Sequence, residues 1–381
     1  MHKIRRTVFS KYGKLFPGIL VMLMIVFALC FSVIGCTRYF LNQRSQKPNS
    51  FVIWKTDDFV EAVTASDNGL AIAAASGDVV KIWSVPSLVL SKKLRDNFMQ
   101  GWALRFSPDG KHLAGGGANN GPADIYMWNV SSGAERWQAK HGSTIHIIGY
   151  SPDGSEVASV GMGKETNNVK GPGTERARIW NVLTGKLVAT IDDIHADVKA
   201  IKFVTNDKLL LFEDTADNGV KVFRVKAFEV NVTSSSGKPL LLHTLKPKKL
   251  VTAIAISPSG NIIATGGRRN GYVTIWHLIH NDVTSQKLYV KGIITALTFS
   301  PDGKKLAIAV DGEPTSSGPV FLLIVDVEKN TVANSLQEES SSGFILSVAF
   351  VPHSDLIIYS QGQYMKGWNY GKQLDRSQSR G

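Results

Sequence analysis

The chain has 381 residues, of which 43% are hydrophobic and 9% aromatic, with 35 glycines and 14 prolines. This length allows a full apolar core, and the composition excludes an intrinsically disordered protein. Eight of the twelve net positive charges lie in residues 1–50, which contain no Asp or Glu. The remaining residues lack the dense basic stripe typical of nucleic-acid-binding domains, so we expect no nucleic-acid partner.

The first predicted element is an apolar helix near the N-terminus. Residues 15–35 carry no charge, and about 20 apolar residues are enough to span a bilayer. Five basic residues precede this run and three follow it in residues 36–50. The positive-inside tendency therefore predicts a cytoplasmic N-terminus and places everything after residue 36 outside the cytoplasm.

Two kinds of membrane attachment stay open at the end of this run. The segment Val33-Ile34-Gly35-Cys36 resembles the lipobox of bacterial lipoproteins, in which the Cys is lipid-modified and becomes the new N-terminus. The run is long for a signal peptide, which favours a retained single-pass anchor, and an ordinary removed signal is a third reading. Both cysteines, Cys30 and Cys36, lie here, so we expect neither disulfides nor a thiolate metal site in the rest of the chain.

Internal repetition is the main signal after the predicted tether at residues 37–50. A turn motif recurs after apolar runs, because Pro, Asp and Gly each favour one position of a tight turn. Its copies are Ser-Asp-Asn-Gly (66–69), Phe-Ser-Pro-Asp-Gly (106–110), Tyr-Ser-Pro-Asp-Gly (150–154), Ile-Ser-Pro-Ser-Gly (256–260) and Phe-Ser-Pro-Asp-Gly (299–303). Each copy predicts a hairpin turn that follows a strand.

A second mark, usually an aromatic residue after an apolar one, follows each turn. The copies are Lys-Ile-Trp (81–83), Tyr-Met-Trp (126–128), Arg-Ile-Trp (178–180), Lys-Val-Phe (221–223), Thr-Ile-Trp (274–276), Leu-Ile-Val (323–325) and Lys-Gly-Trp (366–368). From Trp83 to Trp368 the mean period is about 47 residues.

These repeats resemble WD40 repeats over residues 51–370. The resemblance implies an all-β fold, a seven-bladed β-propeller of four-stranded antiparallel blades, with residues 371–381 as a polar tail. The Asp that usually follows Trp is Ser84, Asn129, Asn181 or His277 here, so the buried hydrogen-bond tetrad of the family is mostly missing. Kelch propellers, suggested by two Gly-Gly pairs, and TolB-like propellers, which share the Ser-Pro-Asp-Gly turn, are the alternatives.

Seven inner strands are predicted to begin near Val60, Gly101, Ile145, Val198, Val251, Ile294 and Ile345. The last repeat has only three clear strands, and Phe51–Trp54 is a strand-like segment ahead of the first. We expect this segment to supply the outer strand of the last blade and so remove an exposed edge.

Comparison of the seven inner strands separates core from surface. One column is aliphatic throughout and is interpreted as core: Val63, Leu104, Ile148, Ile201, Ile254, Leu297 and Val348. Two residues earlier in each strand stands a mixed column, named the mouth column from here on: Glu61, Trp102, His146, Lys199, Thr252, Thr295 and Leu346. The WD40 resemblance places this column around the central channel on the top face. It is either a contact surface or a solvated rim.

Enlarged loops extend this predicted top face. The resemblance places there the loops 115–124, 161–176 and 311–319, together with Arg268-Arg269-Asn270. Lengthened loops on one face are typical of a binding face, and neutral variation of loop length is the other reading. Lys164, Arg176, Arg268 and Arg269 join the mouth column as predicted partner-binding residues, with Trp102 as the main anchor.

These patterns favour a binding protein over an enzyme. The mouth column offers one carboxylate, one imidazole and one ammonium from separate blades, which is a poor set for a metal or an acid–base pair. We predict a membrane-tethered, extracytoplasmic scaffold that binds a protein or peptide, with no catalytic, metal or cofactor site and with Cys36 as the lipidation site. The alternative is a lactonase-like or TolB-like propeller that acts on or binds a small molecule at the channel.

Overall fold

The computed structural model describes residues 50–94, 103–117, 124–142, 144–162, 175–194, 197–217, 220–229, 240–245, 251–267, 271–279, 282–312, 319–339 and 342–371. The predicted N-terminal helix, tether and C-terminal tail lie outside these residues. Within the described ranges no helix is long and apolar enough to cross a membrane.

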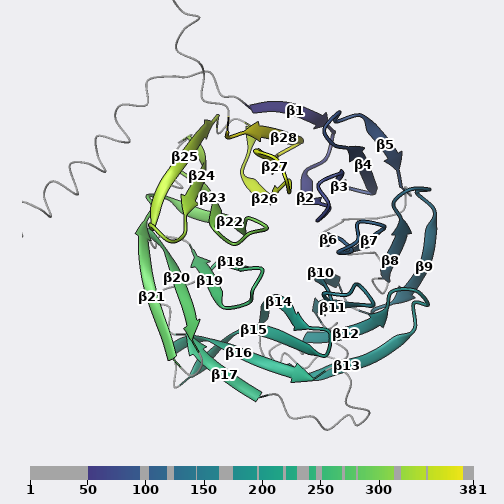
Figure 1. Cartoon of the computed structure of the whole chain (residues 1–381), viewed down its shortest axis with the longest axis horizontal. Helices are drawn as coiled ribbons and strands as arrows, with labels where there is room; N and C mark the ends of the chain where they lie inside the picture. Colours follow the sequence, from purple (N-terminus) through teal and green to yellow (C-terminus); the bar gives the residue numbers. More distant parts are fainter. Residues whose placement is uncertain are drawn as a thin grey trace, which may run out of the picture. The chain divides into compact units, whose positions relative to one another are not determined.

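The described residues form 28 strands, arranged as seven four-stranded antiparallel sheets in a ring (Figure 1). The predicted all-β, seven-bladed propeller is therefore confirmed. In six blades the strands run in chain order from the innermost strand to the outermost. The seventh blade has the order β26, β27, β28 and then β1, so the N-terminal strand closes the ring as expected.

The first four blades occupy the N-terminal part of the propeller. Blade 1 consists of β2 (Val60–Ala65), β3 (Ala71–Ser76), β4 (Val79–Ser84) and β5 (Leu90–Lys93). Blade 2 consists of β6 (Ala103–Phe106), β7 (His112–Gly116), β8 (Asp124–Asn129) and β9 (Glu135–Lys140). Blade 3 consists of β10 (Thr144–Tyr150), β11 (Glu156–Met162), β12 (Glu175–Asn181) and β13 (Leu187–Ile194). Blade 4 consists of β14 (Asp197–Thr205), β15 (Lys208–Asp217), β16 (Val220–Glu229) and β17 (Leu240–Leu245).

The remaining blades complete the ring. Blade 5 consists of β18 (Ala253–Ile256), β19 (Ile262–Gly266), β20 (Tyr272–Ile279) and β21 (Asp282–Tyr289). Blade 6 consists of β22 (Ile293–Phe299), β23 (Lys305–Asp311), β24 (Val320–Asp326) and β25 (Thr331–Glu338). Blade 7 consists of β26 (Ile345–Phe350), β27 (Leu356–Gln361), β28 (Tyr364–Asn369) and β1 (Ser50–Lys55).

The repeated turns join the first and second strands of the blades. In blade 2, Ser107 Oγ donates to Asp109 Oδ1 at 2.6 Å, and Gly110 adopts a φ of 70° that favours glycine. Blade 4 contains a version of this turn that the sequence pattern missed, in which Thr205 Oγ1 donates to Asp207 Oδ1 at 2.5 Å. The hydrogen bond from a hydroxyl to a carboxylate two residues later is therefore kept in this blade without the Pro and Gly of the other copies.

The hydrophobic core lies between neighbouring blades. The buried apolar side chains of the described residues form seven clusters, each of which joins two adjacent blades. In the cluster between blades 5 and 6, Ile275 packs with Ile294 and Val325. Burial of such an aliphatic side chain is worth about 1.5–3 kcal/mol, so each blade depends on both neighbours for its stability.

Hydrogen bonds of the family tetrad survive in two of the blades. In blade 3, Trp180 Nε1 donates to Ser159 Oγ at 2.8 Å, and His141 Nε2 lies 3.4 Å from the carbonyl oxygen of Ser159. In blade 5, Trp276 Nε1 donates to Thr265 Oγ1 at 2.8 Å. Blade 3 thus keeps three interacting members even though Asn181 replaces the usual Asp after Trp.

A buried polar network connects blades 6 and 7 where the ring closes. Lys366 Nζ donates to Glu338 Oε2 and to Gln361 Oε1, both at 2.8 Å, and Tyr359 donates to the other oxygen of Glu338. Burial alone would raise the pKa of Glu338, but hydrogen bonds from Lys366, Ser50 and Tyr359 hold it below its usual value. The network therefore secures an ionised carboxylate at the last interface of the ring.

We expect Lys366→Met to lower the free energy of unfolding by about 3–5 kcal/mol, because it leaves the Glu338 carboxylate buried without its cation. Urea unfolding of the full chain measures this change. Lys329→Met is the matched control, since it removes an exposed pair with Asp326 at 3.4 Å and should change stability by about 0.5 kcal/mol or less. A small effect of both substitutions would contradict a structural role for the network.

Candidate functional site

The inner strands share a β-bulge at the mouth column. The strand register shifts between Val60 and Ala62, Ile145 and Ile147, Val198 and Ala200, Ile294 and Ala296, and Ile345 and Val348. A bulge leaves its extra residue without a partner in the ladder and changes the direction of its side chain. This explains why the mouth column admits charged and polar residues, whereas core packing makes its neighbours apolar.

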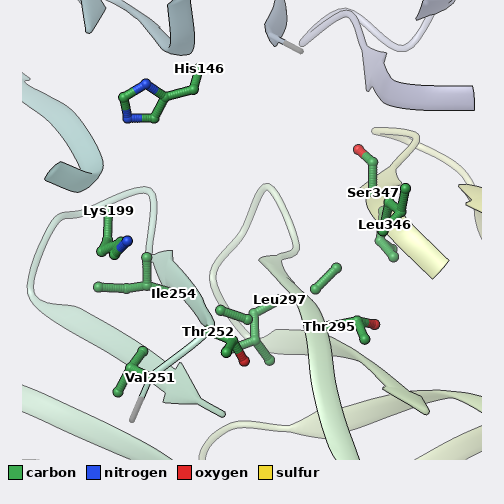
Figure 2. Close-up of a pocket in the computed structure, with 12 residues that line it drawn as sticks. His146, Lys199, Val251, Thr252, Ile254, Thr295, Leu297, Leu346 and Ser347 are labelled. Carbon is green, nitrogen blue, oxygen red and sulfur yellow. The ribbon is translucent and has the colours of Figure 1, made fainter. Parts of the chain in front are cut away.

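Five residues of the mouth column line one cavity, named the mouth cavity here. They are His146, Lys199, Thr252, Thr295 and Leu346, and they come from five consecutive blades, 3 to 7. The cavity has a volume of about 370 Å³. Figure 2 shows His146 and Lys199 on one side of the open space and Leu346 with Ser347 on the other.

Part of the predicted core column also faces the mouth cavity. Ile254, Leu297 and Val348 line the cavity, and the first two are only half-buried. Val348 is also buried in the core cluster between blades 6 and 7, and Ile254 and Leu297 pack against the core clusters next to them. The interpretation of this column as core therefore holds for these residues, which in addition give the cavity an apolar wall.

Polar residues of the mouth column also connect neighbouring blades. Thr252 Oγ1 of blade 5 donates to the carbonyl oxygen of Ile294 in blade 6 at 2.8 Å. His146 Nε2 of blade 3 lies 3.3 Å from the carbonyl oxygen of Val198 in blade 4. Both acceptors directly precede a mouth residue, so the two contacts are equivalent. Thr252 and His146 therefore have a structural role, because each contacts the backbone of the next blade. They are neither contact residues alone nor simply solvated strand ends.

The ring closure uses a similar contact one position further along. The backbone N–H of Val63 in blade 1 donates to Ser347 Oγ of blade 7 at 3.1 Å. Ser347 lies in the cavity wall beside Leu346, whose aliphatic side chain is 47% exposed. An exposed Leu next to a cavity is a feature of contact surfaces more than of solvated strand ends.

Glu61 continues the mouth column in blade 1 but does not line the cavity. Burial, together with the nearby Asp58 carboxylate, raises the pKa of Glu61 to about 7. Its Oε2 atom is buried and has no hydrogen-bond partner among the described residues. An acid–base pair of His146 with Glu61, which the sequence disfavours because the two residues belong to separate blades, gains no support from this placement.

The other predicted contact residues have different outcomes. Arg176 is exposed on β12 and does not line the cavity. Trp102, Lys164, Arg268, Arg269 and the lipidation site Cys36 lie outside the described residues, so their roles stay predictions. Among the described residues, no three His, Cys, Asp or Glu side chains gather closely enough to hold a metal ion.

Sequence reasoning missed two aromatic residues near the cavity. Phe59 and Phe344 are 62% and 56% exposed, and each directly precedes an inner strand. Gly362 joins them, since its carbonyl oxygen accepts from the N–H of Val60 at 2.8 Å and its N–H donates to the carbonyl oxygen of Phe344 at 3.3 Å. The sequence signal for these two residues was a bulky apolar side chain in a segment where a loop is expected.

The closed ring of four-stranded blades, with its Ser-Pro-Asp-Gly turns and a Trp in the third strand of most blades, resembles a WD40-type β-propeller. The profile of the family described as "WD domain, G-beta repeat" matches residues 240–277. This class of propeller suggests a protein-interaction scaffold.

Three similar proteins each align with more than half of this chain. The chain is 24% identical over 223 residues to "Periodic tryptophan protein 2 homolog" of Caenorhabditis elegans, which covers 58% of this chain and 22% of that protein. It is 26% identical over 271 residues to "Protein HIR1" of Kluyveromyces lactis, covering 61% and 29%. It is 25% identical over 222 residues to "SEC12-like protein 2" of Arabidopsis thaliana, covering 56% and 50%. The chain thus spans less than a third of the first two relatives.

The raised pKa of Glu61 predicts a pH-dependent stability difference. A carboxyl whose pKa rises on folding favours the folded state below about pH 4.5 and loses that contribution as the pH rises through about 7. Glu61→Gln should therefore have a Tm close to that of the wild type at pH 5 and a Tm about 2 °C or more higher at pH 8. Thermal unfolding at both pH values measures this.

Glu328→Gln is the control for the loss of one exposed carboxylate. A Glu61→Gln variant that is less stable than the wild type at pH 8 would contradict the buried, poorly solvated state of this carboxyl group.

Proposed function

We propose that the chain is a membrane-tethered scaffold outside the cytoplasm that binds a protein or peptide at the mouth cavity. One observation carries the binding site: five independent inner strands bring mouth residues together on one cavity. Its wall combines the ammonium of Lys199 and the imidazole of His146 with aliphatic side chains. Such a mixture of an apolar surface with a few polar groups is typical of recognition sites.

The N-terminal sequence supports the tether. Residues 15–35 are uncharged, and Cys36 follows small and aliphatic residues. The first strand begins at Ser50 opposite Trp368, whereas Leu346 of the cavity lies at the other end of blade 7, near Gln361 and Tyr364. The first described strand therefore begins at the end of blade 7 that lies away from the cavity.

The rival function, a propeller enzyme or small-molecule-binding protein, has less support. The volume of about 370 Å³ is near the lower end of the range of about 300–1,000 Å³ typical of ligand sites. The described wall contains one imidazole and one ammonium but no carboxylate, and its three hydroxyl groups, those of Thr252, Thr295 and Ser347, already bond the backbone. This wall is better suited to contacts with a polypeptide than to acid–base catalysis.

The double variant Lys199→Ala with Leu346→Ala should fold normally and lose at least about tenfold of its partner recovery, because it removes the cation and the exposed aliphatic contact from the wall. Crosslinking on intact membranes, followed by purification of the full chain, measures recovery. The matched control is Lys304→Ala with Leu70→Ala, which changes an exposed Lys and an exposed Leu in turns at the other end of the blades.

Recovery that the cavity variant leaves unchanged, or that the control reduces equally, would contradict binding at the mouth cavity. Circular dichroism of both variants separates a lost contact from a lost fold.

Lipid labelling tests the form of the anchor. We expect the wild-type chain to incorporate a labelled fatty acid and Cys36→Ala to lose the label, because only a thiol at the lipobox position is modified. Cys30→Ala is the matched control. Cys30 lies inside the apolar run, so a chain without it should still carry the label at Cys36. Membrane association of an unlabelled wild-type chain would instead indicate a retained single-pass anchor.

A further inference from the structure

Three large apolar side chains of blades 7 and 1 are exposed, and one of them, Leu346, lines the mouth cavity. Leu346 lines the cavity and is 47% exposed, while Phe344, two residues earlier, is 56% exposed. Phe59 of the adjoining blade 1 is 62% exposed. Exposure of apolar side chains of this size to water is unfavourable unless a partner covers them.

The backbone around Gly362 holds this apolar sector in a fixed arrangement. Gly362 bonds Val60 on one side and Phe344 on the other, so the loops that carry Phe59 and Phe344 meet at the same turn. Gly362 has a φ of 56°, and a Cβ at this position would lie 2.1 Å from the carbonyl oxygen of Ser342. Backbone hydrogen bonds therefore hold the loops of blades 7 and 1 together at this turn. The turn requires a glycine, because any other residue would be strained at this position.

The opposite side of the cavity is basic. Figure 2 shows His146 and Lys199 across the open space from Leu346 and Ser347. None of the described wall residues is an Asp or Glu. The cavity thus presents a positive side and an apolar side to one occupant, and its charge is complementary to an anion.

Acidic residues on blade 1 restrict how an occupant lies across the cavity. Asp57 and Asp58 directly precede Phe59, and Glu61 follows it. An anionic group placed near Phe59 would meet these carboxylates, so this part of blade 1 favours the apolar portion of an occupant.

We propose that the partner contributes an extended segment in which an Asp or Glu side chain adjoins a bulky apolar side chain. The carboxylate contacts Lys199 inside the mouth cavity, and the apolar side chain covers Leu346, Phe344 and Phe59. This inference rests on the proposed function, because it names the chemistry of the partner at the same cavity. The volume of about 370 Å³ suits one or two side chains of such a segment.

A random peptide library displayed on phage, selected on the purified full chain, tests the chemistry directly. We expect enriched peptides to combine an acidic with a neighbouring aromatic or large aliphatic residue. Fluorescence anisotropy with one enriched synthetic peptide then gives affinities. Replacement of its acidic residue by the amide, or of its apolar residue by Ala, should each weaken binding at least about tenfold.

Variants of the chain complete the test. Lys199→Glu should weaken the acidic peptide at least about tenfold and shift selection toward basic peptides, whereas Lys304→Glu on the far turn should do neither. Phe344→Ser, at an exposed site, should reduce affinity for the wild-type peptide but not for its Ala variant.

The outcomes separate this inference from the proposed function. Enrichment of basic or uncharged peptides whose binding still requires Leu346 would overturn the partner chemistry and leave the cavity as the binding site. Displacement of the peptide by inorganic phosphate with no preference for apolar residues would also overturn it. Peptides that bind equally to the Lys199→Glu and Phe344→Ser variants, or no enrichment at all, would overturn both proposals.

Discussion

The packing of each blade against its two neighbours is the interaction on which the rest of the structure depends. A four-stranded sheet of this size has apolar residues on both faces and has no core of its own. In the described part of the chain, each apolar cluster belongs to two blades, so the ring is stable only when every interface is formed. The N-terminal strand β1 pairs with β28 and thereby connects the two ends of the chain. The buried Glu338–Lys366 pair connects blades 6 and 7 at the neighbouring interface.

The same packing determines where a partner has access. Converging inner strands leave space only for small side chains between them, and Ala253 and Ala296 occupy such places in the cavity wall. The bulges interrupt this regularity at one position of several strands and release longer side chains toward the axis. The mouth cavity is thus a consequence of how the inner strands end, and the identity of the bulged residue sets its chemistry.

The repeats made most of the fold predictable from the sequence. The turn and Trp marks located each blade, and the inner strands begin within two residues of their predicted starts. The Thr205–Asp207 turn was not predicted, because its residues differ from the Ser-Pro-Asp-Gly pattern of the other turns. The Glu338–Lys366 ion pair was not predicted, because the two residues are 28 positions apart in the sequence and belong to different blades.

The candidate site was predictable only as a column of residues. Alignment of the inner strands shows apolar positions that recur with a period of two residues. This period indicates that the aliphatic residue two positions after each mouth residue belongs to the core. The period alone does not show that Ile254 and Leu297 lie on the cavity wall, because this depends on the space between blades. It also gave no information on Phe59 and Phe344, which precede the strands and meet only through the turn at Gly362.

The contacts between blades at the mouth limit the kind of occupant that the cavity accepts. Thr252 and Ser347 use their hydroxyl groups to bond the backbone of the next blade, and His146 lies against Val198 in the same way. An occupant that competes for these groups would weaken the interfaces that hold the ring together. Binding that leaves the ring intact therefore depends on charge and on apolar coverage more than on hydrogen bonds to these hydroxyls. Lys199 and the exposed Leu346 supply these two interactions, which is why an acidic segment with a bulky apolar side chain fits this propeller better than a polar, hydroxyl-rich ligand.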